Sequence, residues 1–409
     1  MDTKLSTYNQ GSSQGNWPAV AILLGGIFGM IIAMGIGRFS FTPILPLMQR
    51  DLGMSNSVAG WLAGLNYLGY LAGAVLCSVV PRLIRSRYVA ANSLVFSIAT
   101  TTAMGLTVSV FWWGTLRFMS GIVSAMLFII VSAEIGEALV RRGYGHWIGA
   151  LYGGVGAGIA LSGLTVPWLD QVGHWNGAWT GMGALAGILA VVGLVITRGK
   201  IDAPRIDTHR PPPKKGMNNL WPLAMAYFFE GLGYIVTATF IVAIVAATPS
   251  LEAYAAYCWV AVGLAAMPST VLWPLIARRI GNKKSLMAAY VIQASGIFVS
   301  MHADSFIEIM FAAITFGGTF MGIVALTLAE GNVRMAHDGR RAAAILTASF
   351  SAGQILGPIV AGFLADMKDG FTLPLLLAST CVMAGWVFTV LDRHFISRKQ
   401  HQGESLCRT

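Results

Sequence analysis

The chain of 409 residues carries a formal net charge of +10, is 56% hydrophobic and 11% charged, and has a mean hydropathy of +0.68. A soluble globule of this size needs many more polar side chains to cover its surface, so the composition indicates an integral membrane protein. The basic residues gather in the connections between apolar segments, so we expect a lipid bilayer, and no nucleic acid, as the partner.

Twelve apolar segments are long enough to cross a bilayer, which takes about 20 residues. We therefore expect an all-α membrane protein with twelve transmembrane helices. The predicted spans in chain order are residues 19–47, 57–80, 88–109, 111–137, 147–168, 177–197, 219–246, 254–277, 285–302, 305–330, 342–365 and 373–391.

The basic residues predict the orientation of these spans. Connections on one side hold 23 of the 27 lysines and arginines, whereas the other side holds only Arg50 and Lys368. Arg38 and Arg117 lie inside spans. Positively charged connections stay on the cytoplasmic side, so both termini are predicted to be cytoplasmic.

The longest connection is polar, basic and rich in proline, which is typical of a linker between domains. It divides the chain into two six-helix halves. The expected organisation is an N-terminal tail (1–18), a first half (19–197), a linker (198–218), a second half (219–392) and a C-terminal tail (393–409).

The two halves resemble each other at a nearly constant offset. GIGRF (35–39) aligns with GLGYI (231–235) at an offset of 196, and GGVGAGIALSG (153–163) aligns with AGQILGPIVAG (352–362) at an offset of 199. The first alignment places Arg38 opposite Tyr234. Such repeats predict two halves related by a pseudo-twofold axis, with the substrate site between them near the bilayer midplane, as in secondary transporters.

Several segments resemble the major facilitator superfamily, and within it the YbfB/YjiJ-type transporters. They are GIGRFSFTPILPLM (35–48), WLAGLNYLGYLAG (61–73), EGLGYIVTATF (230–240) and GQILGP (353–358). The resemblance implies a transporter that works by alternating access, a monomer in a bacterial inner membrane. The sequence departs from the superfamily loop motif at one position: where the motif has aspartate, this chain has Pro81 in the first half and Arg278 in the second.

Arg38 lies deep in the first span, too far from either end to reach water easily. An arginine at the centre of a membrane helix costs about 2.5–3.5 kcal/mol, so it needs a partner, a cavity or a ligand. Thr42 lies one turn further on the same face, and Pro43 and Pro46 free carbonyl groups nearby. We expect Arg38 to face the cavity and bind substrate; a structural arginine bonded to these carbonyls is the alternative.

Glu230 lies in the seventh span, which is equivalent to the first, and it aligns one turn below Arg38. A buried carboxylate there can carry a coupling proton. The alternative is a permanent ion pair between Glu230 and Arg38 that holds the halves together.

Arg117 begins the segment RFMSG (117–121), which resembles a fourth-helix motif that is associated with proton coupling in exporters. The alternative reading places Arg117 near the end of its span, within reach of lipid headgroups. For Glu134 and Glu137 we expect ion pairs with Arg141 or Arg142.

Uncharged polar groups within the spans complete the predicted substrate site, because unpaired polar groups are costly at that depth. Trp61 and Trp259 are expected to form its apolar walls. The polar residues are Asn66, Tyr67, Tyr234 and Gln354.

We find no G-x-S-x-G, H-E-x-x-H or P-loop motif, so we expect a transporter and not an enzyme, with no cofactor and no metal. Arg38 favours a small organic anion moved with protons. A wide aromatic cavity with Glu230 as its acidic group would instead suit proton-driven export of hydrophobic or cationic compounds. A channel or a transporter-like sensor is not excluded by any motif.

Overall fold

The computed structural model describes residues 17–80, 82–198, 220–335 and 339–392, and within these ranges the elements are helices. The first half contains α1 (Trp17–Met30), the π-helix η1 (Ile31–Phe39), α2 (Phe41–Leu52), α3 (Asn56–Val79), α4 (Arg87–Met104), α5 (Val110–Arg141) and α6 (Ile148–Thr197), with short turns η2 (Leu83–Arg85) and η3 (Gly145–Trp147). The second half contains α7 (Trp221–Ala247), η4 (Glu252–Tyr254), α8 (Ala255–Ile280), α9 (Asn282–Ser300), α10 (Phe306–Arg334), α11 (Gly339–Met367) and α12 (Thr372–Leu391). The predicted tails and linker fall almost wholly outside the described residues.

Helix α6 is two antiparallel arms joined by a sharp reversal. Gly173 and His174 have non-helical backbone angles. Thr165 Oγ1 lies 3.3 Å from Met182 Sδ, although a continuous helix would separate these residues by roughly 25 Å at 1.5 Å per residue. The arms therefore correspond to the predicted fifth and sixth spans.

All twelve predicted spans coincide with helical segments. In the described part of the chain, nine helices are long and apolar enough to cross a membrane, with α6 counted once and α4 and α9 not included. The all-α architecture is confirmed, whereas the number of crossings stays a prediction.

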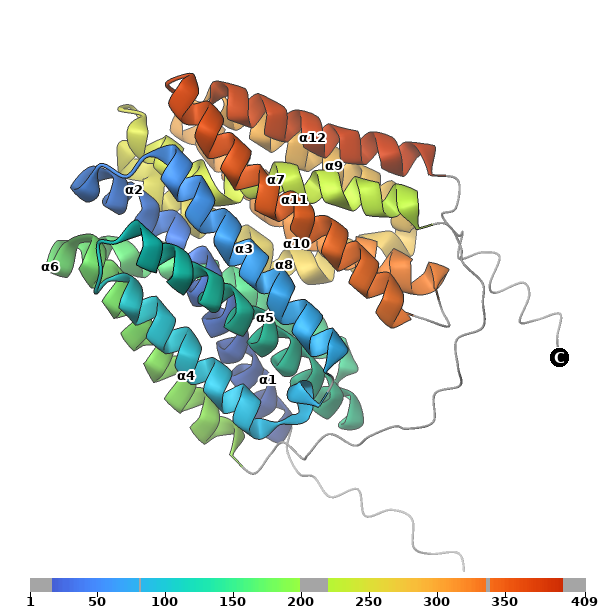
Figure 1. Ribbon diagram of the computed structural model, residues 1–409. Helices are drawn as coiled ribbons and strands as arrows, with labels where there is room; N and C mark the ends of the chain where they lie inside the picture. Colours follow the sequence, from blue (N-terminus) through green and yellow to red (C-terminus); the bar gives the residue numbers. More distant parts are fainter. Residues whose placement is uncertain (1–16, 81, 199–219, 336–338, 393–409) are drawn as a thin grey trace, which may run out of the picture.

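Helices α1 to α6 gather on one side of the molecule and α7 to α12 on the other (Figure 1). The connections around Arg82, Arg141, Arg278 and Arg341 lie at one end of the bundle, which we call the basic end. Arg50 and Lys368 lie at the opposite end.

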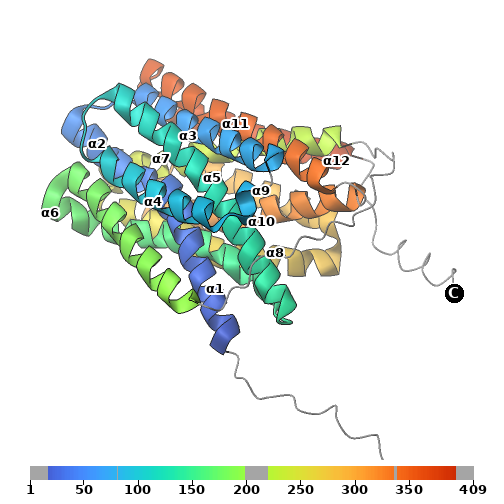
Figure 2. The ribbon, with the colours of Figure 1, turned by 60° about the horizontal axis from the view of Figure 1, so that its bottom comes forward.

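The two halves meet where α3 packs against α11 and where the first arm of α6 packs against α8. Figure 2 shows α3 and α11 side by side from a second direction. A methyl group on Gly60 would lie 2.2 Å from the carbonyl oxygen of Pro358, and one on Gly263 would lie 2.3 Å from the amide nitrogen of Ala160. Glycine thus allows these helix backbones to approach closely.

A carboxylate also links the halves at the end opposite the basic end. Asp366 of α11 accepts hydrogen bonds from the backbone N–H groups of Asn56 and Ser57, at 3.0 and 2.8 Å. These groups belong to the first turn of α3, where the helix dipole favours an anion. The second half therefore supplies a cap for a helix of the first half.

Candidate functional site

A π-helix in the middle of the first span positions Arg38. Each turn of a π-helix is wider than an α-helical turn and shifts the register of the hydrogen bonds. Two serines one turn apart on α5 bond to its carbonyl groups: Ser120 donates to Gly37 at 2.8 Å, and Ser124 donates to Ala33. Gly35 packs directly on Gly158 of α6.

Arg38 is 4% exposed, and its guanidinium lies against two tyrosine rings of α3. The guanidinium carbon is 4.4 Å from the ring centroid of Tyr67 and 4.5 Å from that of Tyr70. Such cation–π contacts stabilise a desolvated guanidinium by about 2 kcal/mol. These contacts offset part of the cost of burying the arginine, but they do not use its N–H groups as hydrogen-bond donors.

Two nitrogens of Arg38 have no hydrogen-bond partner in the described part of the chain. These are Nε and Nη2, whose N–H groups lie on one edge of the planar guanidinium. That edge has the fork geometry that matches the two oxygens of a carboxylate. The predicted bonds between Arg38 and the carbonyls freed by Pro43 and Pro46 do not occupy it.

Arg117 is buried close to Arg38 and does not reach the membrane surface. It is 1% exposed, which contradicts the alternative that it reaches lipid headgroups. Its guanidinium carbon lies 4.7 Å from the ring centroid of Phe41. Asn66 Nδ2 donates to the carbonyl oxygen of Arg117 at 2.9 Å, so the predicted site residue Asn66 lies beside this arginine.

Tyr234 lies within a set of parallel aromatic rings contributed by the second half. Its ring stacks on Phe320 and Phe350, with centroid distances of 5.8 and 5.3 Å. Gln354 Nε2 donates to the Tyr234 hydroxyl oxygen, so the predicted residues Tyr234 and Gln354 do come together. Phe39, next to Arg38, packs edge-to-face on Phe320, with the ring centroids 6.5 Å apart. This contact joins the two halves of the site.

Glu230 is 1% exposed and belongs to a chain of polar side chains in the second half. Gln293 Nε2 donates to Glu230 Oε1 at 2.7 Å, and Thr319 Oγ1 donates to Gln293 Oε1 at 3.0 Å. Glu230 Oε2 is buried with no partner among the described residues. The amide of Gln293 thus bridges Thr319 and the carboxyl group of Glu230.

Arg38 and Glu230 form no ion pair within the described residues. The alternative of a permanent Arg38–Glu230 pair thus does not describe this conformation. Thr42, on the helix that follows Arg38, donates to the carbonyl oxygen of Ala238 in α7 at 2.6 Å. This bond links the first and seventh spans directly.

The two predicted tryptophan walls have different surroundings. Trp259 is fully buried, and its indole N–H donates to Ser162 at 3.1 Å. Trp61 is 57% exposed on the outer surface, so its predicted role as a wall was wrong.

The residues beside the site that the sequence analysis missed include Tyr70 and Gln293. Tyr70 follows Tyr67 at a spacing of three, which places both on one helix face, and this spacing was the available signal. Gln293 is a lone amide in a membrane helix; nothing in the sequence connects it to Glu230.

Within the described ranges, one group of side chains has ligand atoms close enough for a metal ion. Asp51, Asp170 and His174 bring such atoms within 4.8 Å of one another at the end opposite the basic end. Arg50 already pairs with both carboxylates, at 2.7 Å to Asp51 and 2.8 Å to Asp170. The arginine thus supplies the cation that this cluster needs.

The sequence profile of a family described as "Uncharacterised MFS-type transporter YbfB" matches residues 30–389. The chain belongs to this family. The match covers the π-helix, the buried arginines and the aromatic set, and it confirms the resemblance found in the sequence. Members of this MFS-type family are multi-pass membrane transporters.

Individual relatives agree with the family. The uncharacterized transporter YycB of Bacillus subtilis (strain 168) is 26% identical over 373 residues, which cover 84% of this chain and 87% of YycB. The uncharacterized MFS-type transporter YceJ of the same organism is 20% identical over 366 residues, covering 84% and 89%.

Solved structures share the fold. The nucleoside transporter NupG matches with a TM-score of 0.68 at 13% identity, over 92% of this chain and 99% of NupG. A bacterial homolog of the human lysosomal transporter Spinster, in an inward-facing and occupied conformation, also matches with a TM-score of 0.68 at 13% identity, over 92% and 97%.

Proposed function

We propose that this MFS-type transporter moves a small organic anion that bears a carboxylate group, by alternating access and together with protons. The observation that carries the proposal is the edge of Arg38. Its Nε and Nη2 groups are buried, have no partner in the described chain and have the geometry that binds two oxygens of one carboxylate.

The balance of buried charge supports an anionic substrate. Neither Arg38 nor Arg117 takes part in an ion pair among the described residues, and Glu230 is the buried carboxyl group of the neighbouring region. An uncompensated charge in a low-dielectric interior is costly. A bound anion would offset that cost.

Glu230 is the proposed carrier of the coupling proton. One of its oxygens accepts from Gln293, and the other has no partner in the described residues. A protonated carboxyl group donates one hydrogen bond and accepts others, so the free Oε2 is the atom on which a proton can reside. Intramembrane carboxylates of this kind often serve as proton relays.

Substitution of Arg38 tests the proposed substrate class. We expect Arg38→Ala and Arg38→Lys both to slow carboxylate uptake at least about tenfold, because lysine keeps the charge but not the fork. A thermal-shift screen of the purified protein against small carboxylates, sugars and drug-like cations at two pH values would first select the substrate. Uptake by proteoliposomes then gives the rates.

Tyr70→Phe is the matched control, because it keeps the ring against the guanidinium and should retain at least half of the uptake rate. Normal carboxylate uptake by both Arg38 variants would refute the anion proposal.

Export of hydrophobic or cationic compounds is the second candidate function. The buried Glu230 and the stacked rings around Tyr234 favour it. In that case Glu230→Gln would abolish transport, whereas both Arg38 variants would transport normally.

A further inference from the structure

The first half contains a cavity away from the proposed substrate site. It has a volume of about 250 Å³ and lies between α1, α4, α5 and the second arm of α6. Glycine, alanine, leucine, isoleucine and valine form most of its wall, together with Phe28. Its polar side chains are Thr197, whose hydroxyl donates to Gly193 at 2.8 Å, and Glu134.

Glu134 has no ion pair or hydrogen bond through its carboxylate in the described chain, so its predicted pairing with Arg141 or Arg142 was wrong. The neighbouring Glu137 does pair with Arg141, at 3.5 Å, as predicted. Glu134 therefore lines an otherwise apolar cavity as its one ionisable group.

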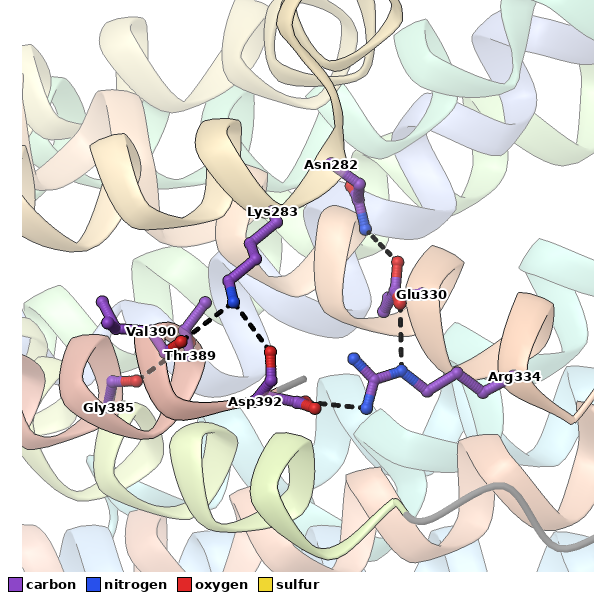
Figure 3. A network of polar contacts seen from close by, with 8 residues as sticks. All are labelled: Asn282, Lys283, Glu330, Arg334, Gly385, Thr389, Val390 and Asp392. Atoms are coloured by element: carbon purple, nitrogen blue, oxygen red, sulfur yellow. Dashed lines mark hydrogen bonds and ion pairs between the residues drawn. The ribbon is translucent and has the colours of Figure 1, made fainter. Parts of the chain in front are cut away.

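The internal repeat gives this carboxylate a counterpart. At the offset of 196, Glu134 aligns with Glu330 of α10. Glu330 accepts from Arg334 Nε at 3.0 Å and from Asn282 Nδ2 at 2.9 Å, and Arg334 also pairs with Asp392 at 2.7 Å (Figure 3). In the second half, cationic and amide donors thus engage the carboxylate fully.

The first half keeps the carboxylate but lacks both donors. At the same offset, Ala138 replaces Arg334 and Ser86 replaces Asn282. The Ser86 hydroxyl accepts from the backbone N–H of Val89 as a cap of α4, so it is already in use. Among the described side chains, the cavity thus lies where the second half has a cation from its own chain.

The cavity reaches the outer surface of the bundle. Leu194, on its rim, is 62% exposed, and Ala91 is exposed as well. These residues belong to the second arm of α6 and to α4, on a surface that faces lipid in a membrane transporter. A ligand can therefore enter from the bilayer.

We propose that this cavity binds an amphiphilic primary amine that enters from the bilayer. The ammonium group donates to Glu134, as Arg334 and Asn282 donate to Glu330, and the apolar body fills the space between α1 and α4. The volume is below the usual 300–1,000 Å³ of a site for drug-sized ligands, so the body is a short alkyl chain or a single ring. This site does not depend on the proposed function of Arg38.

Calorimetric titration of the purified full-length protein tests the proposal, with 2-phenylethylamine as the probe and 2-phenylethanol as its neutral analogue. We expect the amine to bind at least about tenfold more tightly than the alcohol, because the bond to a carboxylate is charge-assisted. Glu134→Gln should weaken amine binding at least tenfold. Equal binding of the two probes, or an unchanged affinity in Glu134→Gln, would overturn the proposal.

Further variants separate this site from its surroundings. Glu137→Gln removes a nearby carboxylate that is already paired, and Arg38→Ala alters the central site; both should bind the amine normally. Ala138→Arg gives Glu134 the partner that Glu330 has and should abolish binding.

If Ala138→Arg does not fold, Ala91→Leu at the exposed rim narrows the cavity and should weaken binding instead. A loss in Glu137→Gln equal to that in Glu134→Gln would show a general surface attraction and contradict the site.

Discussion

Glu230 and Arg38 are both buried, and each has polar atoms without a partner in the described residues. Leaving a buried polar group unsatisfied costs about 1–3 kcal/mol. Binding of a transported ligand and its coupling ion would offset this cost. The two groups thus differ from Arg334, which its own chain neutralises.

The role of Glu230 can be separated from its contribution to packing. Glu230→Gln keeps the size of the side chain and a hydrogen bond to Gln293 but carries no titratable proton. We expect accumulation driven by a pH gradient to fall at least about tenfold, while exchange of substrate between the two sides continues. Both are measured in proteoliposomes, and unchanged accumulation would contradict proton transfer through Glu230.

Gln293 is expected to act on transport through Glu230 and not by touching substrate. Gln293→Leu removes the donor to Glu230 Oε1 and leaves a second carboxyl oxygen without a partner. We expect the pH profile of uptake to shift relative to the parent while the profile of Thr315→Val, on the nearby α10, stays in place. An unshifted profile in Gln293→Leu would show that the amide has only a structural role.

At the scale of helices, α6 and α8 pack with their backbones in close contact. Gly263 and Gly156 contact each other's helices, and a methyl group on either would fall within 2.6 Å of backbone atoms. Membrane helices pack in this way because dispersion contacts replace the hydrophobic effect as the driving force. These helices belong to different halves, so their spacing also affects how the halves move.

Gly263→Ala is therefore expected to destabilise the protein, because the methyl group forces α6 and α8 apart. We expect a loss of at least about 1 kcal/mol, measured as a lower thermal unfolding midpoint in detergent. Gly187→Ala is the matched control: a methyl group there has nothing within 4 Å. Since alanine favours the helix by about 0.5–1 kcal/mol, the control should be neutral or slightly stabilising, and equal destabilisation of both variants would refute the packing argument.

At the scale of the whole molecule, two polar contacts between the halves lie toward the end opposite the basic end. Asp366 caps α3 there, and Thr42 bonds to α7. Alternating access by rocking of two halves requires that such contacts break when that end opens. Their strength therefore sets part of the balance between conformations.

Asp366→Ala should shift that balance toward the conformation open at this end, because the bonds from Asp366 to the first turn of α3 are lost. A cap contributes about 0.5–2 kcal/mol, which corresponds to a several-fold change in population. Spin labels on the first turn of α3 and the last turn of α11 would report a longer distance. Asp369→Asn at the same end is the control, since asparagine tolerates its φ of 50°; an unchanged distance in Asp366→Ala would contradict the role of the cap.

The sequence alone predicted the helical architecture well, because a span must be long and apolar whatever its neighbours are. It did not predict the π-helix, since apolar composition carries no information on hydrogen-bond register within a buried helix. The first span also extends to Leu52 instead of 47, because Gly53, with a φ of 64°, is the residue that ends the helix. The reversal at Gly173 and His174 lies in the gap predicted between two spans.

Part of the site was also predictable from the sequence. Arg38, Tyr67 and Tyr234 stood out because polar groups are rare at that depth. Trp61 was misplaced because lipid-facing and core-facing sides of a membrane helix are both apolar, so periodicity does not separate them. The link from Gln293 to Glu230 depends on the relative rotation of two helices, which one sequence does not contain.

The bond from Thr42 to Ala238 joins residues separated by 196 positions, the offset that relates the two halves. Each residue thus touches its own counterpart, which places the pseudo-twofold axis between them. Contacts away from that axis occur as pairs that the axis relates, such as α3 with α11 and α6 with α8. A substitution that disrupts one contact of such a pair leaves the other intact. The contact between Thr42 and Ala238 lies on the axis and has no symmetry-related partner, so no equivalent contact remains when it is lost.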